Sequence, residues 1–128
     1  MTGHLLDASV LIALSVTGHE HNQVARRAVT ALPRVVLCPV VEGALVRTLL
    51  RLGESASTCV MHLGLLHAMP GWHRVADDLS YRDADLSWVI GHRQVTDAYL
   101  LSLAHHHGLT LLTLDSALAA REGAELIR

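Results

Sequence analysis

Four carboxylate residues stand in apolar segments of the chain, where an acid is hard to explain as part of the structure. Asp7 and Asp115 end two apolar runs, and Glu42 and Asp97 lie on the apolar faces of two predicted helices. A buried carboxylate is costly without a partner, yet the chain has no lysine and few arginines near these positions. A divalent cation is the simplest remaining partner. Four convergent carboxylates suit Mg²⁺ or Mn²⁺, which prefer oxygen ligands.

A cluster of this kind predicts hydrolysis of a phosphodiester. One ion lowers the pKa of a water molecule and orients it, and a second ion ~3.5–4 Å away stabilises the leaving oxygen. Ser9 and Thr96 stand beside two of the acids, so we expect their hydroxyls to hydrogen-bond a ligand carboxylate or a water. The sequence indicates no covalent catalyst, because Cys38 and Cys59 have apolar neighbours and no Ser-His-Asp constellation is evident.

Each acid also has a structural interpretation when it is taken alone. Asp7 and Asp115 follow strands and begin helices, which is an ordinary N-cap arrangement. Glu42 and Asp97 stand in first helical turns, where the helix dipole favours negative charge. These alternatives stay open for single residues, but the set of four at helix starts favours a shared metal site.

The elements that must position the acids follow from short apolar runs alternating with helical periods. We expect strands at 4–7, 34–38, 72–76, 109–114 and 125–127. We expect helices at 9–16, 20–31, 40–52, 55–68, 97–107 and 115–121, with Thr96 as the cap of the fifth, and a further helix from Asp83 or Asp85 to Ile90. This alternation predicts an α/β fold with a parallel sheet covered on both faces. Such sheets bind ligands at the carboxyl ends of their strands, where Asp7 and Asp115 lie.

Length and composition restrict the class of protein. A chain of 128 residues predicts a single domain over 1–128. The formal net charge of −2 excludes a protein that grips nucleic acid by bulk positive charge, so arginines and bound metal would make that contact. We find no signal-peptide pattern and no apolar stretch of the ~20 residues that span a bilayer. We therefore expect a cytoplasmic protein with no membrane contact.

Four sequence blocks, in this order and at these separations, resemble a PIN-domain ribonuclease, and specifically the VapC-type toxins of bacterial type II toxin–antitoxin pairs. The blocks are LLDASVLIAL from residue 5, PVVEGALVR from 39, VTDAYLLSLA from 95 and LTLDSALA from 112. The resemblance spans nearly the whole chain. It implies a three-layer PIN-like α/β fold, with a central parallel sheet of four to five strands and helices on both faces.

The resemblance also implies an activity, a site and partners. The activity is endonucleolytic cleavage of RNA, often tRNA or rRNA, with one or two Mg²⁺ or Mn²⁺ ions. The family's small polar positions match Ser9, Thr96 and Thr113. The family further implies a small cognate antitoxin of the VapB type and frequent homodimers. Its acidic quartet carries over to Asp7, Glu42, Asp97 and Asp115.

Several basic residues have more than one interpretation. Arg47 and Arg51 share a helix face opposite Glu42, and they could grip phosphates, contact an acidic antitoxin tail or simply be solvated. Arg93 precedes the block that contains Asp97 and could reach the site. Ten histidines suggest zinc at first sight. However, the three at 105–107 stand ~100° apart on a helix, so we expect that they do not converge on one ion.

Two other classes of protein compete with a nuclease. A non-catalytic protein-interaction module could keep the PIN fold, although a full acidic quartet argues against it. A phospho-accepting receiver domain also has carboxylates at strand ends, but it needs a lysine that this chain lacks.

Overall fold

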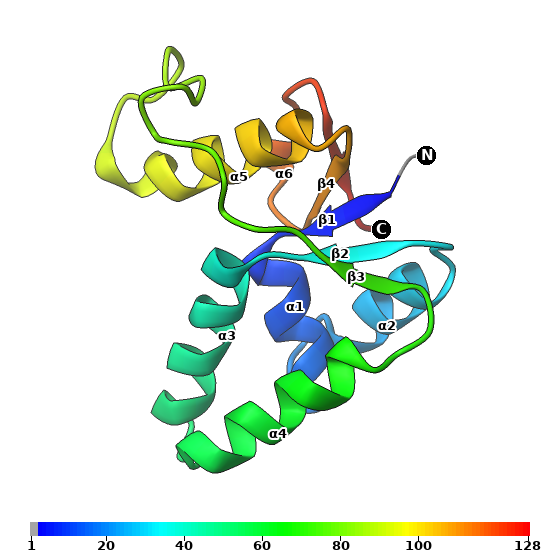
Figure 1. Cartoon of the computed structure of the whole chain (residues 1–128). Helices are drawn as coiled ribbons and strands as arrows, with labels where there is room; N and C mark the ends of the chain where they lie inside the picture. Colours follow the sequence, from blue (N-terminus) through cyan, green and yellow to red (C-terminus); the bar gives the residue numbers. More distant parts are fainter. Residues whose placement is uncertain (1–2) are drawn as a thin grey trace.

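The computed structural model describes residues 3–128, and a five-stranded sheet forms its centre (Figure 1). All neighbouring strands pair in parallel, in the order β3-β2-β1-β4-β5. The strands are β1 (His4–Leu6), β2 (Val35–Leu37), β3 (Trp72–Arg74), β4 (Thr110–Thr113) and β5 (Ala124–Leu126). The predicted parallel sheet of four to five strands is confirmed, and it has five.

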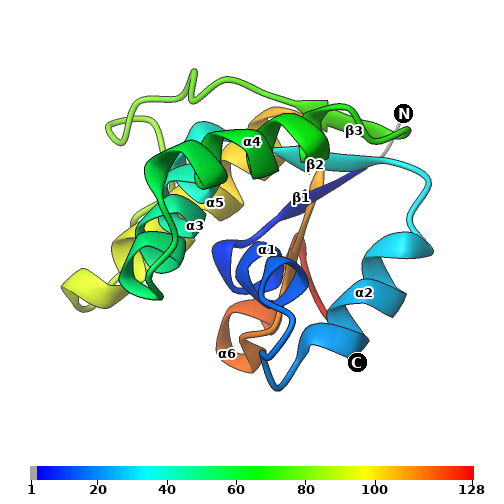
Figure 2. The ribbon, with the colours of Figure 1, turned by 90° about the horizontal axis from the view of Figure 1, so that it is seen from below.

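Helices cover both faces of this sheet. They are α1 (Ala8–Ser15), α2 (Asn22–Thr30), α3 (Pro39–Arg51), α4 (Ala56–His67), α5 (Val95–His106) and α6 (Ser116–Ala119), with a 3₁₀ turn η1 (His92–Gln94) before α5. The chain steps from β1 to β2 to β3 in one direction, so right-handed crossovers place α1 to α4 on one face. The step from β3 back to β4 reverses direction, which places α5 and α6 on the other face. Figure 1 shows the two layers, and Figure 2 views the molecule from the side on which α1 and α4 lie. Within residues 3–128, no helix has the length and apolar character needed to cross a bilayer.

The central strands are apolar along their length because helices exclude water from both sides of them. Leu5, Leu6 and Val36 have no solvent exposure, and Cys38 is equally buried. Burial raises the pKa of the Cys38 thiol to about 11, so this cysteine is a core residue and not a thiolate nucleophile. The core consists mainly of leucine and valine, as a chain without phenylalanine requires.

The sheet has a topological switch point between β1 and β4. The chain leaves β1 towards β2 on one side and later returns to place β4 on the other side. Leu6 is in register with Leu112, and the backbone N–H of Asp7 donates to the Leu112 carbonyl at 2.9 Å. Open parallel sheets bind ligands in the crevice at such a point. Asp7 and Asp115 follow these two strands and therefore lie at the same edge.

The helix expected from Asp83 or Asp85 to Ile90 is wrong, since residues 75–91 form loops and turns. Polar side chains in this segment bind nearby backbone groups instead of leaving them to a helix. The Asp85 carboxylate accepts from the Ser87 N–H at 3.0 Å, and the Ser80 hydroxyl accepts from the Arg82 N–H at 3.1 Å. The apolar residues that suggested a helix do not form one buried face, because Ile90 is 94% exposed.

The predicted cap of the fifth helix is also wrong. Helix α5 begins at Val95 and its N-cap is Gln94, so Thr96 stands inside the first turn. The 3₁₀ turn η1 continues directly into α5, so the residues just before α5 are already in a helical turn. The amide oxygen of Gln94 accepts from the Ile90 N–H at 2.6 Å, which anchors the incoming loop. A side-chain cap at Thr96 is therefore not needed.

Two glycines allow a matched test of the packing between the segments that lead into β2 and β3. Gly71 has φ +81°, and a Cβ there would stand 3.0 Å from the Pro33 carbonyl oxygen. Gly71→Ala should lower the free energy of unfolding by about 1–3 kcal/mol, because the backbone is strained and the contact is close. Gly64→Ala, in an open position of α4, should raise that free energy by up to about 1 kcal/mol. Urea unfolding measures both; equal effects would contradict this account.

Candidate active site

Asp7 is the most firmly held of the four acids. It ends β1, caps α1 and is only 6% exposed. Its Oδ1 accepts from the Ala8 N–H at 2.8 Å, and its Oδ2 accepts from the Ser9 hydroxyl at 2.8 Å and the Thr113 hydroxyl at 2.7 Å. Three hydrogen-bond donors therefore hold the buried Asp7 side chain in a fixed orientation at the carboxyl end of β1.

The same hydroxyl groups join the end of β1 to the end of β4. Thr113 is fully buried, and its Oγ1 accepts from the Asp115 N–H at 3.0 Å. The Ser9 hydroxyl accepts from the Leu114 N–H at 3.3 Å. The side chains expected to support the acids thus connect Asp7 to the backbone that carries Asp115.

Asp115 and Asp97 complete an acidic cluster with Asp7. Asp115 is exposed and caps α6, where its Oδ1 accepts from the Ala117 and Leu118 N–H groups at 2.9 and 3.2 Å. Asp97 is half-buried in the first turn of α5. Burial, together with the negative charges of Asp7 and Asp115, raises the pKa of Asp97 to about 6. The charges of Asp7 and Asp115 therefore act on the Asp97 carboxyl group.

No cationic side chain neutralises this cluster within the part of the chain that the structure describes. The five ion pairs found there all join a histidine to an acid, and none includes Asp7, Asp97 or Asp115. In particular, no arginine within residues 3–128 forms an ion pair with these three acids. Three carboxylates without a protein counter-charge fit a hard divalent cation, whose preferred ligands are oxygen atoms.

Glu42 differs from the other three acids because it already has a partner. In the first turn of α3, its Oε2 is hydrogen-bonded to Nε2 of His67, at the end of α4. The other ring nitrogen, Nδ1 of His67, lies 3.4 Å from Arg74 Nη1. Glu42 also does not contribute to the charges that raise the pKa of Asp97. Asp7 and Asp115 thus act electrostatically on Asp97, whereas Glu42 is held by a separate contact with His67.

Sequence reasoning missed His67 as the partner of Glu42. The helical pattern places Arg47 and Arg51 on the face opposite Glu42 and indicates no partner within α3. The partner is His67, 25 positions away, which approaches Glu42 from α4. The packing of α3 against α4 creates this contact, and no spacing within one segment indicates it.

The remaining predicted contact residues lie on the surface. Arg47 and Arg51 are exposed on α3, and Arg93 is exposed in η1. Thr96 is exposed as well. Across residues 3–128, none of them forms an ion pair or side-chain hydrogen bond with the four acids. Their roles towards RNA, an antitoxin or a bound ion stay predictions.

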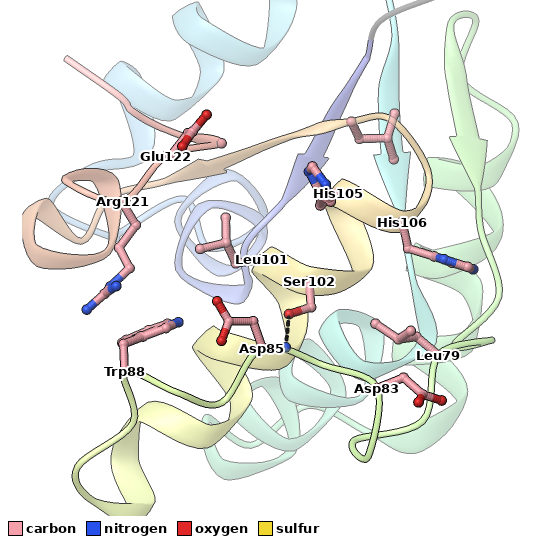
Figure 3. A pocket seen from close by; sticks show the side chains of 12 residues that line it. Leu79, Asp83, Asp85, Trp88, Leu101, Ser102, His105, His106, Arg121 and Glu122 are labelled. Atoms are coloured by element: carbon pink, nitrogen blue, oxygen red, sulfur yellow. Dashed lines mark hydrogen bonds between the residues drawn. The ribbon is translucent and has the colours of Figure 1, made fainter.

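A pocket of about 650 Å³ lies elsewhere, between α5 and the loop that follows β3 (Figure 3). Its walls include Leu79, Trp88, Leu101 and Arg121, and the Arg121 guanidinium stacks over the Trp88 ring at 3.9 Å. None of the four acids lines it. The candidate active site is instead the open edge of the sheet at the switch point.

Comparisons with known proteins identify the family. The family model of the PIN domain matches residues 4–124. Ribonuclease VapC29 of Mycobacterium tuberculosis is 42% identical over 120 residues, which cover 93% of this chain and 90% of that protein. Ribonuclease VapC38 of the same species is 35% identical, over 88% of this chain and 84% of that protein. The chain belongs to the PIN-domain family and, within it, to the VapC-type ribonucleases.

Solved structures share the fold at low sequence identity. The crystal structure of Mycobacterium tuberculosis VapC20, described as a toxin that cleaves the sarcin-ricin loop, aligns with a TM-score of 0.74 at 16% identity and covers 98% of this chain and 99% of that one. A toxin–antitoxin complex from Klebsiella pneumoniae aligns with a TM-score of 0.68 at 18% identity, covering 94% of each chain. These alignments confirm the PIN-like α/β fold.

Thr113 provides a test of the hydroxyl network. Thr113→Val removes the donor to Asp7 and the acceptor for the Asp115 N–H without changing the side-chain shape. We expect a loss of about 1–3 kcal/mol in the free energy of unfolding, since buried polar groups lose their partners. Thr113→Ser keeps the hydroxyl and should lose less. Urea unfolding measures the free energy of unfolding of both variants and the wild type. A Thr113→Val protein as stable as the wild type would contradict a stabilising role of the hydroxyl network.

Asp97 provides a test of carboxylate crowding through pH. Its folded pKa of about 6 exceeds the ordinary value of 3.8, so the folded state binds more protons than the unfolded state between these values. In metal-free protein, the stability contributed by this group is therefore present below pH 4 and is lost as pH rises through 6. Asp97→Asn removes this loss. At pH 7.5 with chelator, the Asp97→Asn protein should therefore be more stable than the wild type. The expected gain in the free energy of unfolding is only about 1 kcal/mol, because water screens the half-exposed carboxylate.

The stability difference between Asp97→Asn and the wild type should vanish near pH 4, and Asp83→Asn, which changes an exposed acid outside the cluster, should show no difference at either pH. Chemical denaturation at the two pH values measures all three proteins. An Asp97→Asn protein that is no more stable than the wild type at pH 7.5 would contradict the crowding.

Proposed function

We propose that this protein is a divalent-metal-dependent endoribonuclease that acts as the toxin of a toxin–antitoxin pair. The observation that supports the proposal is that Asp7 and Asp115, which follow the strands at the switch point, act electrostatically on Asp97. Within residues 3–128, none of these three acids forms an ion pair. The names of its relatives support the same activity, because VapC29 and VapC38 are ribonucleases. Its RNA substrate would be a tRNA or an rRNA.

The metal ligands we propose are Asp7, Asp97 and Asp115, with Glu42 at the margin of the site and Mg²⁺ or Mn²⁺ as the ion. When bound, one or two such ions supply Lewis-acid activation of a water and stabilise charge at phosphorus. Ser9 and Thr113 keep the Asp7 carboxylate oriented through the hydrogen bonds described above. Asp115 engages one oxygen in capping α6, which leaves its other oxygen for a ligand. The raised pKa of Asp97 implies that it loses its proton fully only above pH 6 or on binding a cation.

Glu42 has a less direct part in this proposal. Its hydrogen bond to His67 already engages one carboxylate oxygen and restricts the side chain. The Glu42–His67 hydrogen bond therefore supports a role for Glu42 in positioning water or RNA. Glu42 would contribute less to metal affinity than Asp7, Asp97 and Asp115.

Surface residues support contacts with macromolecules. Arg93 stands in η1, immediately before the helix that carries Asp97, so we propose it as a phosphate contact. Arg47 and Arg51 on α3 would contact RNA or the antitoxin. Exposed apolar side chains on α4, namely Val60, Met61 and Leu65, support a protein partner. A cognate VapB-type antitoxin and a second copy of the chain are the partners we propose.

Activity on RNA tests the proposal. Purified protein with Mn²⁺ or Mg²⁺ should cleave total RNA, and chelator should stop it. Asp97→Asn should lower the rate on the order of a hundredfold or more, because metal-dependent stabilisation of the transition state amounts to several kcal/mol. Asp83→Asn, the matched control outside the cluster, should cleave as the wild type does. Sequencing the ends of the products would identify the cut site.

Two outcomes would contradict the proposal. Cleavage that survives Asp97→Asn would reject the assigned site, and folded wild-type protein without any metal-dependent cleavage would favour the non-catalytic interaction module. Expression in bacteria separates these from a failure of the toxin role: the wild type should arrest growth and Asp7→Asn should relieve the arrest.

A further inference from the structure

Three potential metal ligands converge at the end of α5 that is remote from the acidic cluster. Asp78 lies in the loop after β3, and His106 and His107 end the helix. Asp78 Oδ1 is 2.7 Å from His107 Nε2 and 3.8 Å from His106 Nε2. The three ligand atoms all lie within 4.8 Å of one another. This spacing is close to that of ligands around one ion with bonds of about 2.0–2.2 Å.

The sequence prediction that the consecutive histidines do not converge is wrong for two of them. His107 is the C-cap of α5, with φ −96° and ψ 8°, so its backbone has left the helical conformation. The rings of His106 and His107 are 5.0 Å apart and nearly perpendicular. Asp78, 28 residues before His106, is hydrogen-bonded to His107 through its Oδ1. His105 and His106 point in different directions from α5, as Figure 3 shows.

Contacts other than the histidines hold the loop that carries Asp78. The buried Tyr99 of α5 donates from its hydroxyl to the Leu79 carbonyl at 2.8 Å. The Tyr81 ring stacks on the Tyr99 ring, with centroids 4.3 Å apart. Asp78 is therefore positioned by its neighbours in the loop before any ion binds, and such preorganisation lowers the cost of binding.

We propose that Asp78, His106 and His107 form a second metal site, which binds a borderline transition ion such as Zn²⁺. Two imidazoles and one carboxylate are typical ligands of Zn²⁺ and Co²⁺, whereas Mg²⁺ prefers oxygen ligands alone. The side chains of His106 and Asp78 are 46% and 49% exposed, so water would complete the coordination. The ion would join the loop after β3 to the end of α5.

This site is distinct from the acidic cluster, and it does not depend on the proposed nuclease activity. Asp97 is in the first turn of α5 and His106 is its last residue. At 1.5 Å per residue these positions are about 14 Å apart along the helix axis. The two sites also differ in ligand chemistry, with oxygen ligands at one end of α5 and mainly nitrogen ligands at the other.

Titration of full-length, tag-free protein with Co²⁺ and Zn²⁺ tests the site. After treatment with chelator, the wild type should bind one Co²⁺ whose visible absorption reports nitrogen ligands, and Zn²⁺ should raise its melting temperature. Loss of a ligand in His107→Ala or Asp78→Asn should weaken binding about tenfold or more, because even the loss of an outer hydrogen-bond partner of a ligand costs this much. His105→Ala, which changes the neighbouring histidine, should bind as the wild type does.

Further variants keep each outcome decisive. His107→Gln retains most of the side-chain volume, so a loss of binding in both His107 variants, with wild-type circular dichroism, excludes misfolding. Binding unchanged in His107→Ala and Asp78→Asn would overturn the proposal and indicate another histidine pair such as His19 and His21. Loss of binding in Asp97→Asn would overturn it as well, since the ion would then belong to the acidic cluster. RNA cleavage by His107→Ala at the wild-type rate would show that the two sites act separately.

Discussion

The burial of Asp97 beside the negative charges of Asp7 and Asp115 is the constraint on which the proposed site depends. The backbone prevents their separation, because two of them follow neighbouring strands and the third is fixed in the first turn of α5. Hydroxyl groups of Ser9 and Thr113 reinforce this arrangement at the one acid that is buried. The fold thus holds negative charge in a position that costs stability in the absence of a cation and favours the binding of one.

The switch point explains why these particular acids meet. A parallel sheet whose strand order reverses must open a crevice between the strands on either side of the reversal, here β1 and β4. Residues that follow those strands project to the same edge, although 108 positions separate Asp7 from Asp115 in the chain. Helix α5 returns over the opposite face of the sheet and contributes Asp97 from its own N-terminal end. If both proposed sites bind metal, α5 would have oxygen ligands at one end and imidazole ligands at the other.

Much of the fold and part of the site could be predicted from the sequence. The strands were predictable because continuous apolar runs such as that before Asp115 indicate burial on both faces, and the position of Asp7 and Asp115 follows from strand direction alone. The predictions of a Thr96 cap and of a helix over 83–90 were wrong because side chains and turns there supply the hydrogen bonds that a helix or its cap would otherwise form. The Glu42–His67 pair and the convergence of Asp78 with His106 and His107 depend on packing between distant segments, which no local spacing encodes.

Anomalous diffraction from crystals grown with Mn²⁺ would show whether Asp7, Asp97 and Asp115 bind a metal ion together. The crowding of the acids predicts an anomalous peak about 2–2.5 Å from carboxylate oxygens of Asp7 and of at least one of Asp97 and Asp115. The peak should disappear in crystals of Asp97→Asn grown in the same way. Crystals in which Mn²⁺ occupies other positions and leaves these three carboxylates without an ion between them would contradict the account.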